Sequence, residues 1–168
     1  MAFPKQAVIL AGGRGTRLVP FTDFAPKPLM RFHDRPFLEY LIEQLREQGF
    51  ERVLLLLGYR ADAVMEHFGD GGRFGVEITY SVLPPEDETG RRIKNALAHL
   101  DPLFLLLYCD NYWPMPFADM WRHYQTHSAS AMVTVFSNED GSTRDNLRIG
   151  SDGFVEIYDK SRQAPALK

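Results

Sequence analysis

The sequence predicts an α/β fold with a mainly parallel sheet and helices on both faces. Along the 168 residues, short apolar segments alternate with segments that have helical periodicity. The segment at 103–109 is apolar almost throughout, as expected for a central parallel strand covered on both faces. A glycine-rich turn follows the apolar segment at 6–11, and ligands of such sheets bind beyond the carboxyl ends of the strands.

The order of the predicted elements agrees with this fold class. A buried strand at 6–11 is followed by a long proline-containing loop and a short strand at 29–32. Pro36 opens a helix through about residue 48, and Gly49 ends it. The later elements are predicted to be strands at 52–57, 76–82, 103–109 and 131–136, helices at 61–68, 90–100 and 117–127, and a hairpin with strands at 147–149 and 154–158.

The composition is typical of a globular protein with one domain, which we expect to span residues 1–168. Hydrophobic residues make up 45% of the chain and charged residues 24%. No apolar run approaches the roughly 20 residues that a membrane helix needs, and the first residues lack the apolar stretch of a signal peptide. The single cysteine, Cys109, is consistent with a reducing compartment. We therefore expect a cytoplasmic protein without a membrane partner.

Positive charge is concentrated in the first part of the chain. The net charge of the whole chain is −3, which argues against a nucleic acid as partner. Residues 1–35 hold six Lys or Arg and two Asp, a net of +4, whereas the remainder holds 13 basic and 20 acidic residues, a net of −7. This distribution favours a small anionic ligand bound near the glycine-rich turn.

The turn after the first strand has the residues of a phosphate-binding loop. Gly12, Gly13 and Gly15 allow close backbone approach, and their N–H groups can form an anion-binding concavity. Arg14 and Arg17 add forked donors that suit phosphate. A Walker loop is excluded because the required Gly-Lys-Ser/Thr is absent. A dinucleotide fingerprint is excluded because its last glycine is missing. The remaining alternative is a flexible surface turn.

Two segments together carry a resemblance to a known family. Residues 7–18 read AVILAGGRGTRL and are followed by Pro20, and residues 25–29 read APKPL. They resemble the signature of the nucleoside-diphosphate-sugar pyrophosphorylases, which are sugar-1-phosphate nucleotidyltransferases. The match continues through residues 35–40, the strand that ends at Asp110 and the final hairpin. The resemblance implies a three-layer, Rossmann-like sheet of the nucleotide-diphospho-sugar transferase type.

The resemblance also implies the reaction and its partners. Enzymes of this family transfer a nucleotidyl group from a nucleoside triphosphate to a sugar 1-phosphate and release pyrophosphate, with Mg²⁺ as cofactor. In-line attack at the α-phosphorus needs positioning and charge neutralisation more than covalent catalysis. The implied context is nucleotide-sugar biosynthesis for cell-surface polysaccharide.

Site residues are carried over from the family by position. Arg17 would hold the leaving pyrophosphate, Lys27 would contact the reacting phosphates, and Asp110 would bind Mg²⁺. The alternatives are a solvated loop lysine for Lys27 and a turn cap for Asp110. The nucleotide-binding set is Ala11, Gly12, Gly13, Arg14, Gly15, Thr16, Glu88, Thr89 and Gly90. The sugar-phosphate set is Asn111, Asp159 and Lys160, with an ordinary polar strand end as the alternative for the last two.

The helix start at 88–93 departs from the family. It resembles the Glu-Thr-Gly-Gly-Gly-Ile segment of a bacterial subgroup, but Arg91 and Arg92 replace two glycines. This subgroup includes heptose- or mannose-1-phosphate guanylyltransferases and N-acetylmuramate-1-phosphate uridylyltransferases, and the segment lies near the base and sugar. The two arginines would clash with that ligand, recognise an additional anionic group or project from the helix start.

Substrate choice is therefore left open between related reactions. Cys109 replaces the usual glycine before the metal-binding Asp, and Leu83 stands where some relatives carry a polar side chain that reads the base. We expect GTP with a heptose or mannose 1-phosphate. The alternatives are a UTP- or dTTP-dependent transferase and a catalytically degenerate nucleotide-sugar-binding module.

Family members are longer than this chain. They continue by a further strand-and-helix layer that includes a second acidic metal ligand, which has no counterpart in these 168 residues. We therefore expect the chain to be the catalytic N-terminal portion of a domain truncated at its C-terminus. In some relatives the transferase is fused to a sugar phosphatase, which is an expected partner here.

Overall fold

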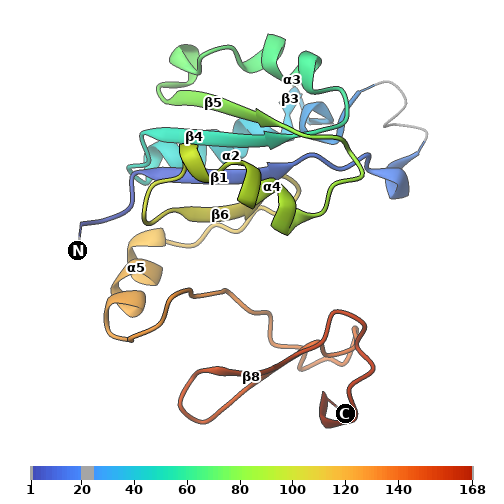
Figure 1. The fold of residues 1–168 in the computed structure, drawn as a ribbon, viewed down its shortest axis with the longest axis vertical. Coiled ribbons are helices and arrows are strands. Elements are labelled where there is room, and N and C mark those ends of the chain that lie inside the picture. Colours follow the sequence, from blue (N-terminus) through green and yellow to red (C-terminus); the bar gives the residue numbers. More distant parts are fainter. Residues whose placement is uncertain (1, 20–24, 168) are drawn as a thin grey trace. The chain divides into compact units, whose positions relative to one another are not determined.

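The computed structural model describes residues 2–19 and 25–167 and divides the chain into two compact units (Figure 1). The first unit spans Met1–Ser128 and the second Ala129–Lys168. Pro20 and the side chain of Arg17 lie outside the described part of the chain. No helix in the described ranges is long and apolar enough to cross a membrane.

The first unit is built on a four-stranded parallel sheet. Its order is β5 (Glu77–Val82), β4 (Arg52–Leu57), β1 (Gln6–Ala11) and β6 (Leu105–Tyr108). Ala11 lies opposite Leu57, Leu57 lies opposite Val82, and Leu10 lies opposite Tyr108. The carboxyl ends of all four strands therefore meet at one edge, and the predicted parallel α/β sheet is confirmed.

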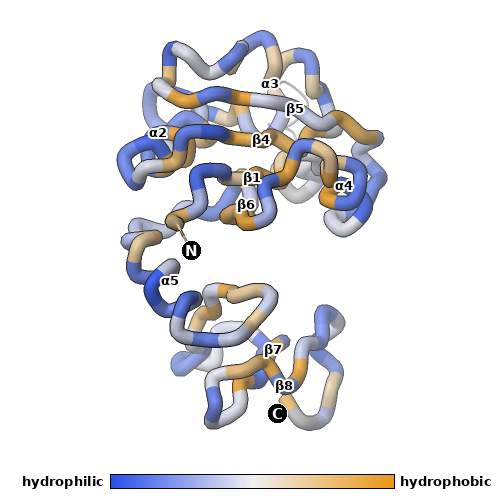
Figure 2. The backbone as a smooth tube through the Cα atoms, turned by 60° about the vertical axis from the view of Figure 1, so that its left-hand side comes forward, coloured by the Kyte–Doolittle hydropathy of each residue, from blue (hydrophilic) through white to orange (hydrophobic). Residues whose placement is uncertain are grey.

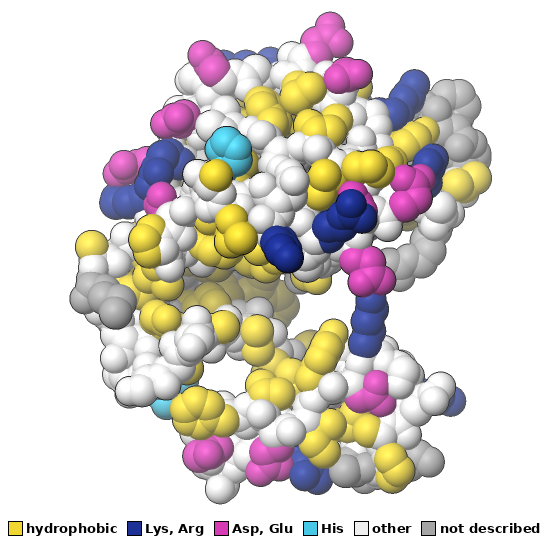
Figure 3. Space-filling model, in the orientation of Figure 1, with side chains coloured by type: hydrophobic (Ala, Val, Ile, Leu, Met, Phe, Trp, Pro, Cys, Tyr) yellow, Lys and Arg dark blue, Asp and Glu magenta, His cyan; other side chains and the backbone are white. Residues whose placement is uncertain are grey.

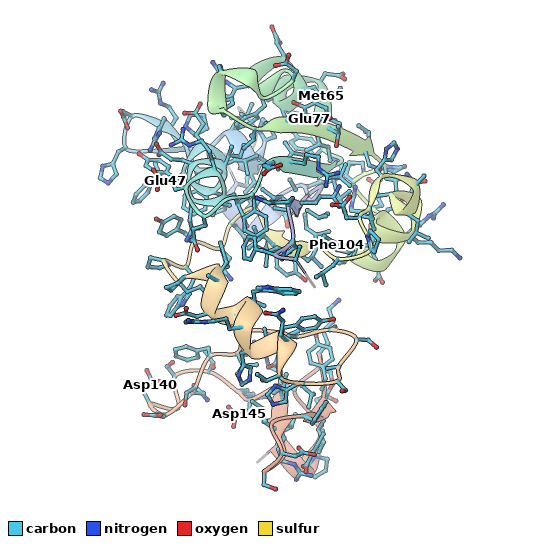
Figure 4. All side chains as sticks on the ribbon, turned by 90° about the vertical axis from the view of Figure 1, so that its left-hand side faces the viewer. Glu47, Met65, Glu77, Phe104, Asp140 and Asp145 are labelled. Atoms are coloured by element: carbon cyan, nitrogen blue, oxygen red, sulfur yellow. The ribbon has the colours of Figure 1, made fainter. Side chains whose placement is uncertain are left out.

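Helices cover both faces of this sheet (Figure 1). Ala7, Ile9 and Ala11 of β1 pack in one apolar cluster with α2 (Phe37–Glu47), α3 (Ala61–Phe68) and Phe117 of α5 (Phe117–Gln125). Val8 and Leu10 pack in a second cluster with Ala96 and Ile93 of the segment around α4 (Thr89–Asn95). Phe104, labelled in Figure 4, packs against this second cluster. Alternate β1 residues thus point to opposite helical layers, because successive side chains of a strand face opposite ways.

The helix α2 shows how an apolar stripe positions an element. Its buried residues are Leu38, Leu41, Ile42 and Leu45, a spacing that places them on one side of the helix. Figure 2 shows β1 and β4 as largely hydrophobic segments of the first unit. Burying each such side chain contributes about 1.5–3 kcal/mol to folding. This packing holds the strand ends, and the loops that follow them, in fixed positions.

Short elements complete the first unit. The predicted strand at 29–32 is a two-residue ladder of β2 (Arg31–Phe32) and β3 (Arg35–Pro36). The predicted helix at 90–100 ends at Asn95 and continues as the 3-10 helix η4 (Leu97–His99). Further 3-10 helices are η1 (Thr16–Leu18), η2 (Lys27–Leu29) and η3 (Gly72–Phe74).

The prediction of a central position for the strand at 103–109 is wrong. In the described residues β6 is the edge strand of the sheet and pairs with β1 alone. Leu106 is exposed, and Tyr108 is 55% exposed. An apolar run indicates a strong tendency to be buried, but it does not determine which neighbours a strand has within its own sheet.

The second unit contains the predicted hairpin. Strands β7 (Leu147–Ile149) and β8 (Val155–Tyr158) pair antiparallel, and Gly153 in the turn has a φ of 82°. A 3-10 helix, η5 (Pro165–Leu167), follows. The predicted buried strand at 131–136 is wrong: these residues form no strand, and Phe136 is 72% exposed. An extended segment needs a neighbouring ladder to become a strand, and no described residues of this unit pair with it.

Candidate active site

The predicted nucleotide-binding loop and three other loops begin at the same edge of the sheet. They follow β1, β4, β5 and β6, which end side by side. The backbone N–H of Tyr59 donates to the carbonyl of Gly12 at 3.2 Å, and that of Cys109 donates to the carbonyl of Leu10 at 3.1 Å. These bonds extend the pairing of the strands into the loops and fix where the loops start.

Two predicted catalytic residues, Lys27 and Asp110, form an ion pair at this edge. Lys27 Nζ donates to Asp110 Oδ2 across 83 residues of sequence. Pro26 and Pro28 on either side of Lys27 are both buried. Because prolines restrict φ, the backbone of Lys27 is held and its charge is positioned. The side chains are 24% and 40% exposed, so both groups remain accessible to a ligand.

The glycine-rich loop is open at Gly13. Gly13 is exposed and has no heavy atom within 4 Å of the place where a Cβ would lie. Gly15 adopts the left-handed conformation with a φ of 66°, and the N–H of Leu18 donates to its carbonyl at 2.8 Å. Thr16, in the following turn, is exposed. Gly15 thus adopts a backbone conformation that favours glycine, as predicted, whereas Gly13 leaves open space beside the backbone.

Arg14 connects this loop to the loop after β5. Its guanidinium donates to Glu86 Oε1 at 2.6 Å, and it also lies over the ring of Tyr59 at 5.6 Å from the centroid. Both Arg14 and Glu86 are exposed, so the pair contributes little to stability. On the face drawn in Figure 3, Lys and Arg side chains of the first unit are interspersed with Asp and Glu side chains.

Arg92 is the site residue that sequence reasoning did not place. It is only 4% exposed, although it carries a charge. A Cβ atom at Gly12 would overlap its guanidinium, so the side chain lies directly against the loop. The guanidinium donates to a ring of backbone carbonyls, those of Leu57 (2.6 Å), Pro84 (2.6 Å), Asp87 (3.1 Å), Leu83 (3.4 Å) and Gly12 (3.5 Å).

The two arginines of the helix start behave differently. Arg91 projects into solvent with its side chain 74% exposed and pairs with Asp87 Oδ1 at 3.0 Å. Arg92 instead connects the loops that follow β1, β4 and β5. The predicted nucleotide-binding residues Glu88, Thr89 and Gly90 are exposed at the start of α4. Of the interpretations left open, projection from the helix start applies to Arg91 alone.

Gly58 is packed too closely for any side chain. A Cβ atom there would overlap the carbonyl oxygen of Gly12, which belongs to the backbone and cannot move aside cheaply. We expect Gly58→Ala to lower the free energy of unfolding by about 1–3 kcal/mol, because overpacking forces the two loops apart. Gly13→Ala is the matched control, with an expected change within about 0.5 kcal/mol since that position is open. Urea denaturation measures both, and equal stabilities of the two variants would contradict this packing.

Cys109 precedes Asp110 in the chain and is buried. Burial raises the pKa of its thiol to about 12, and the neighbouring Asp110 carboxylate adds to the effect. A thiol with this pKa is about one part in ten thousand thiolate at pH 8, and only the thiolate is a good nucleophile.

We expect Cys109 in the folded chain to react with a disulfide reagent at least about 100-fold more slowly than in denaturant at pH 8. Its rate in the folded chain should go on increasing above pH 10. The rate of an ordinary thiol, which has a lower pKa, levels off there because that thiol is already ionised. Absorbance of the released aromatic thiolate reports the rate directly, since the chain has one cysteine. Equal rates in the folded and unfolded chain would show that Cys109 is accessible.

The predicted sugar-phosphate residues fall in both units. Asn111 is exposed beside Asp110 in the first unit, whereas Asp159 and Lys160 follow β8 in the second. The Asp159 carboxylate accepts hydrogen bonds from Ser161 Oγ (2.6 Å) and from the N–H groups of Ser161, Gln163 and Ala164 (each 2.8 Å). These bonds, that of the Ser161 side chain first, hold the pKa of Asp159 well below its usual range. Asp159 thus caps a turn, and its contact with a sugar stays a prediction.

The acidic groups of the described residues fit a metal ion that is held in part by the substrate. Among the described residues, no group of three or more His, Cys, Asp or Glu side chains could hold a metal by itself. Asp110 is a single accessible carboxylate next to the positive charge of Lys27. Mg²⁺ is often bound in this manner, by one or two carboxylates together with substrate phosphates and water.

Comparison with known proteins defines the family. A model of the nucleotidyl transferase family matches residues 6–146. The UTP–glucose-1-phosphate uridylyltransferase AglF of Haloferax volcanii is 28% identical over 164 residues, covering 96% of this chain and 67% of its own length. The D-glycero-alpha-D-manno-heptose 1-phosphate guanylyltransferase of Campylobacter jejuni is 40% identical over 92 residues, covering 55% of this chain and 41% of its own length.

Solved structures agree with these relatives. The structure of HddC from Yersinia pseudotuberculosis complexed with GMP-PN superposes with a TM-score of 0.64 and 30% identity, covering 71% of this chain and 53% of that one. The chain therefore spans between about two fifths and two thirds of the length of these proteins.

The parallel sheet and the glycine-rich loop after β1 together indicate the kind of protein to which the chain belongs. A glycine-rich loop at the carboxyl edge of a parallel sheet is typical of α/β proteins that bind phosphate groups. The chain belongs to the nucleotidyl transferase family.

Proposed function

We propose that the chain carries the catalytic portion of a sugar-1-phosphate nucleotidyltransferase. The observation that carries this proposal is the ion pair of Lys27 and Asp110 at the sheet edge where the glycine-rich loop begins, in a chain of this family. Transfer from a triphosphate requires that the negative charge near the reacting phosphorus be neutralised. Lys27 supplies a positive group, and Asp110 supplies a carboxylate that could bind a cation.

The reaction follows from these groups. An oxygen of the sugar 1-phosphate attacks the α-phosphorus of the nucleoside triphosphate, a new P–O bond forms, and the bond to the bridging oxygen breaks, so that pyrophosphate leaves. The backbone N–H groups at Gly13 and Gly15 hold phosphate oxygens. Lys27 neutralises charge on the reacting phosphates, and Arg17 orients the pyrophosphate. Asp110, together with phosphate oxygens of the substrate, would hold Mg²⁺, which would supply further charge neutralisation.

The proposed substrates are GTP and a heptose or mannose 1-phosphate. The Campylobacter relative and the HddC structure with GMP-PN support this choice. The alternative is a UTP-dependent reaction, supported by the relative from Haloferax, which matches nearly the whole of this chain. We place the enzyme in the cytoplasm, in the supply of nucleotide-sugars for cell-surface polysaccharide. A sugar phosphatase, fused or separate, would be its partner in that pathway.

A panel of nucleoside triphosphates and sugar 1-phosphates tests the proposal, with pyrophosphate release as the readout. We expect the highest rate with GTP and a heptose or mannose 1-phosphate, and a requirement for Mg²⁺. Release with UTP and glucose 1-phosphate alone would establish the alternative. If no pair gives release, and Asp110→Ala changes nothing, the proposal fails. A chain that binds nucleotide without turnover would instead be the nucleotide-sugar-binding module.

A further inference from the structure

A positive side chain fills the space against the first glycine of the nucleotide loop. Glycine at position 12 leaves room for a group to touch the backbone, and in this structure that group is the guanidinium of Arg92. The side chain reaches this place from the first turn of α4, and its two ends are fixed: the backbone by the helix and the guanidinium by five carbonyls.

The ring of carbonyls around Arg92 determines what else could bind there. Every polar group that the guanidinium contacts in this ring is a backbone oxygen, and these oxygens only accept hydrogen bonds. A phosphate, which is an anion and an acceptor, would be repelled. The position therefore fits a flat group with several N–H donors, and it is separate from the open side of the loop at Gly13.

One part of a nucleotide has this chemistry. Guanine carries an N1–H and an N2 amino group joined through one carbon, the same N–C–N arrangement of donors as in guanidinium. Adenine lacks the N1–H and the N2 amino group. Guanine would thus meet the carbonyls of Leu57, Leu83 and Pro84 with the donors that Arg92 now provides.

We propose that Arg92 is an internal competitor of the guanine base, which must leave the carbonyl ring before GTP binds completely. This inference rests on the proposed function, since it names the base pocket of the same site. With Arg92 in place, the loop binds the polyphosphate at Gly13 and Gly15, and the base stays outside. Arg92 thereby sets both the affinity for GTP and the choice of base.

A second observation shows where the displaced side chain would go. Asp87 is largely buried, and its Oδ2 has no hydrogen-bond partner among the described residues, while Oδ1 pairs with Arg91. A buried carboxylate oxygen without a donor is costly. Arg92 already donates to the backbone carbonyl of Asp87 at 3.1 Å, so a side-chain rotation would bring its donors to this carboxylate.

The test compares binding of GTP, ATP and inorganic tripolyphosphate to the unaltered chain and to Arg92→Ala, by calorimetry. We expect Arg92→Ala to bind GTP at least ten-fold more tightly, ATP at most two-fold more tightly, and tripolyphosphate unchanged. Lys94→Ala is the matched control and should bind GTP as the unaltered chain does, because Lys94 is an exposed cation on the same helix. Guanidinium chloride at 50 mM should weaken GTP binding to Arg92→Ala more than sodium chloride at the same concentration.

Equal or weaker binding of GTP by Arg92→Ala, or no GTP binding by either chain, would overturn the proposal. If Arg92→Ala does not fold, the Nε–H resonance of Arg92 in the unaltered chain replaces it as a readout. GTP should shift that resonance, whereas tripolyphosphate should leave it in place, and an unshifted signal under saturating GTP would also overturn the proposal. None of these measurements needs turnover. A failure of the sugar-transfer reaction alone would therefore leave the role of Arg92 intact. Likewise, unchanged GTP binding by Arg92→Ala would leave the proposed transfer reaction intact.

Discussion

Replacing Asp110 by Asn is expected to lower kcat/KM for nucleotide-sugar formation by about 10³-fold. Such a factor corresponds to about 4 kcal/mol of lost transition-state stabilisation, the size expected when a metal-bound carboxylate at the reacting phosphates is removed. Asn keeps the shape of the side chain but loses its charge. The variant also loses the attraction to Lys27, so pyrophosphate release should be measured over a range of Mg²⁺ concentrations.

The matched control for this variant is Asp119→Asn. Asp119 lies on α5 with its side chain 58% exposed, where it pairs with Arg122. It should keep full activity, because it is placed away from the strand ends. Full activity of Asp110→Asn, with an unchanged dependence on Mg²⁺, would mean that Asp110 only caps the turn after β6.

Replacing Lys27 by Met is expected to lower kcat/KM by about 10²–10³-fold. Lys27 is held between two buried prolines with its charge fixed, and a fixed charge stabilises a transition state without further reorganisation. Met keeps the length and apolar stem of the side chain, so the loss reports the ammonium group. Pyrophosphate release at saturating and limiting GTP separates the effects on kcat and KM.

Lys94→Met serves as the control for Lys27→Met. Lys94 is exposed on α4 and carries the same charge. Activity of Lys27→Met equal to that of Lys94→Met would identify Lys27 as a solvated loop lysine. The double variant of Lys27 and Asp110 should be little slower than Asp110→Asn alone, because the two residues act on the same phosphates.

The elements of the first unit follow from sequence patterns because each buries one face against the same core. The strand at 6–11 and the helix with Leu38, Leu41, Ile42 and Leu45 are predictable from their periodicity and from the residues that bound them. The position of β6 at the sheet edge is not predictable in this way, because an apolar segment predicts burial but does not determine which strands lie beside it. The segment at 131–136 failed for a related reason: its apolar residues predict a strand, but hydrogen bonding needs a second strand.

The site was predictable where chain topology brings residues together. The glycine-rich loop and Asp110 follow β1 and β6, which are adjacent parallel strands that end at one edge. Lys27 comes much later in the chain than the end of β1, so the family resemblance and not the topology predicted its place beside Asp110. The buried position of Arg92 was not predictable. Its partners are backbone carbonyls of three loops, and every residue has a carbonyl, so no residue type in the sequence indicates them. The available signal was steric: Gly12 and Gly58 follow two adjacent strands, and only residues without a side chain leave room there for a large group such as the Arg92 guanidinium.

The fate of labelled phosphorus distinguishes nucleotidyl transfer to a sugar 1-phosphate from simple hydrolysis of the triphosphate. GTP labelled at the α-phosphorus is mixed with mannose or heptose 1-phosphate, Mg²⁺ and the chain, and a parallel sample carries the label at the γ-phosphorus. We expect the α-label in a nucleotide-sugar and the γ-label in pyrophosphate, in equal amounts. Release of the γ-label as orthophosphate, with no α-label joined to sugar, would contradict nucleotidyl transfer.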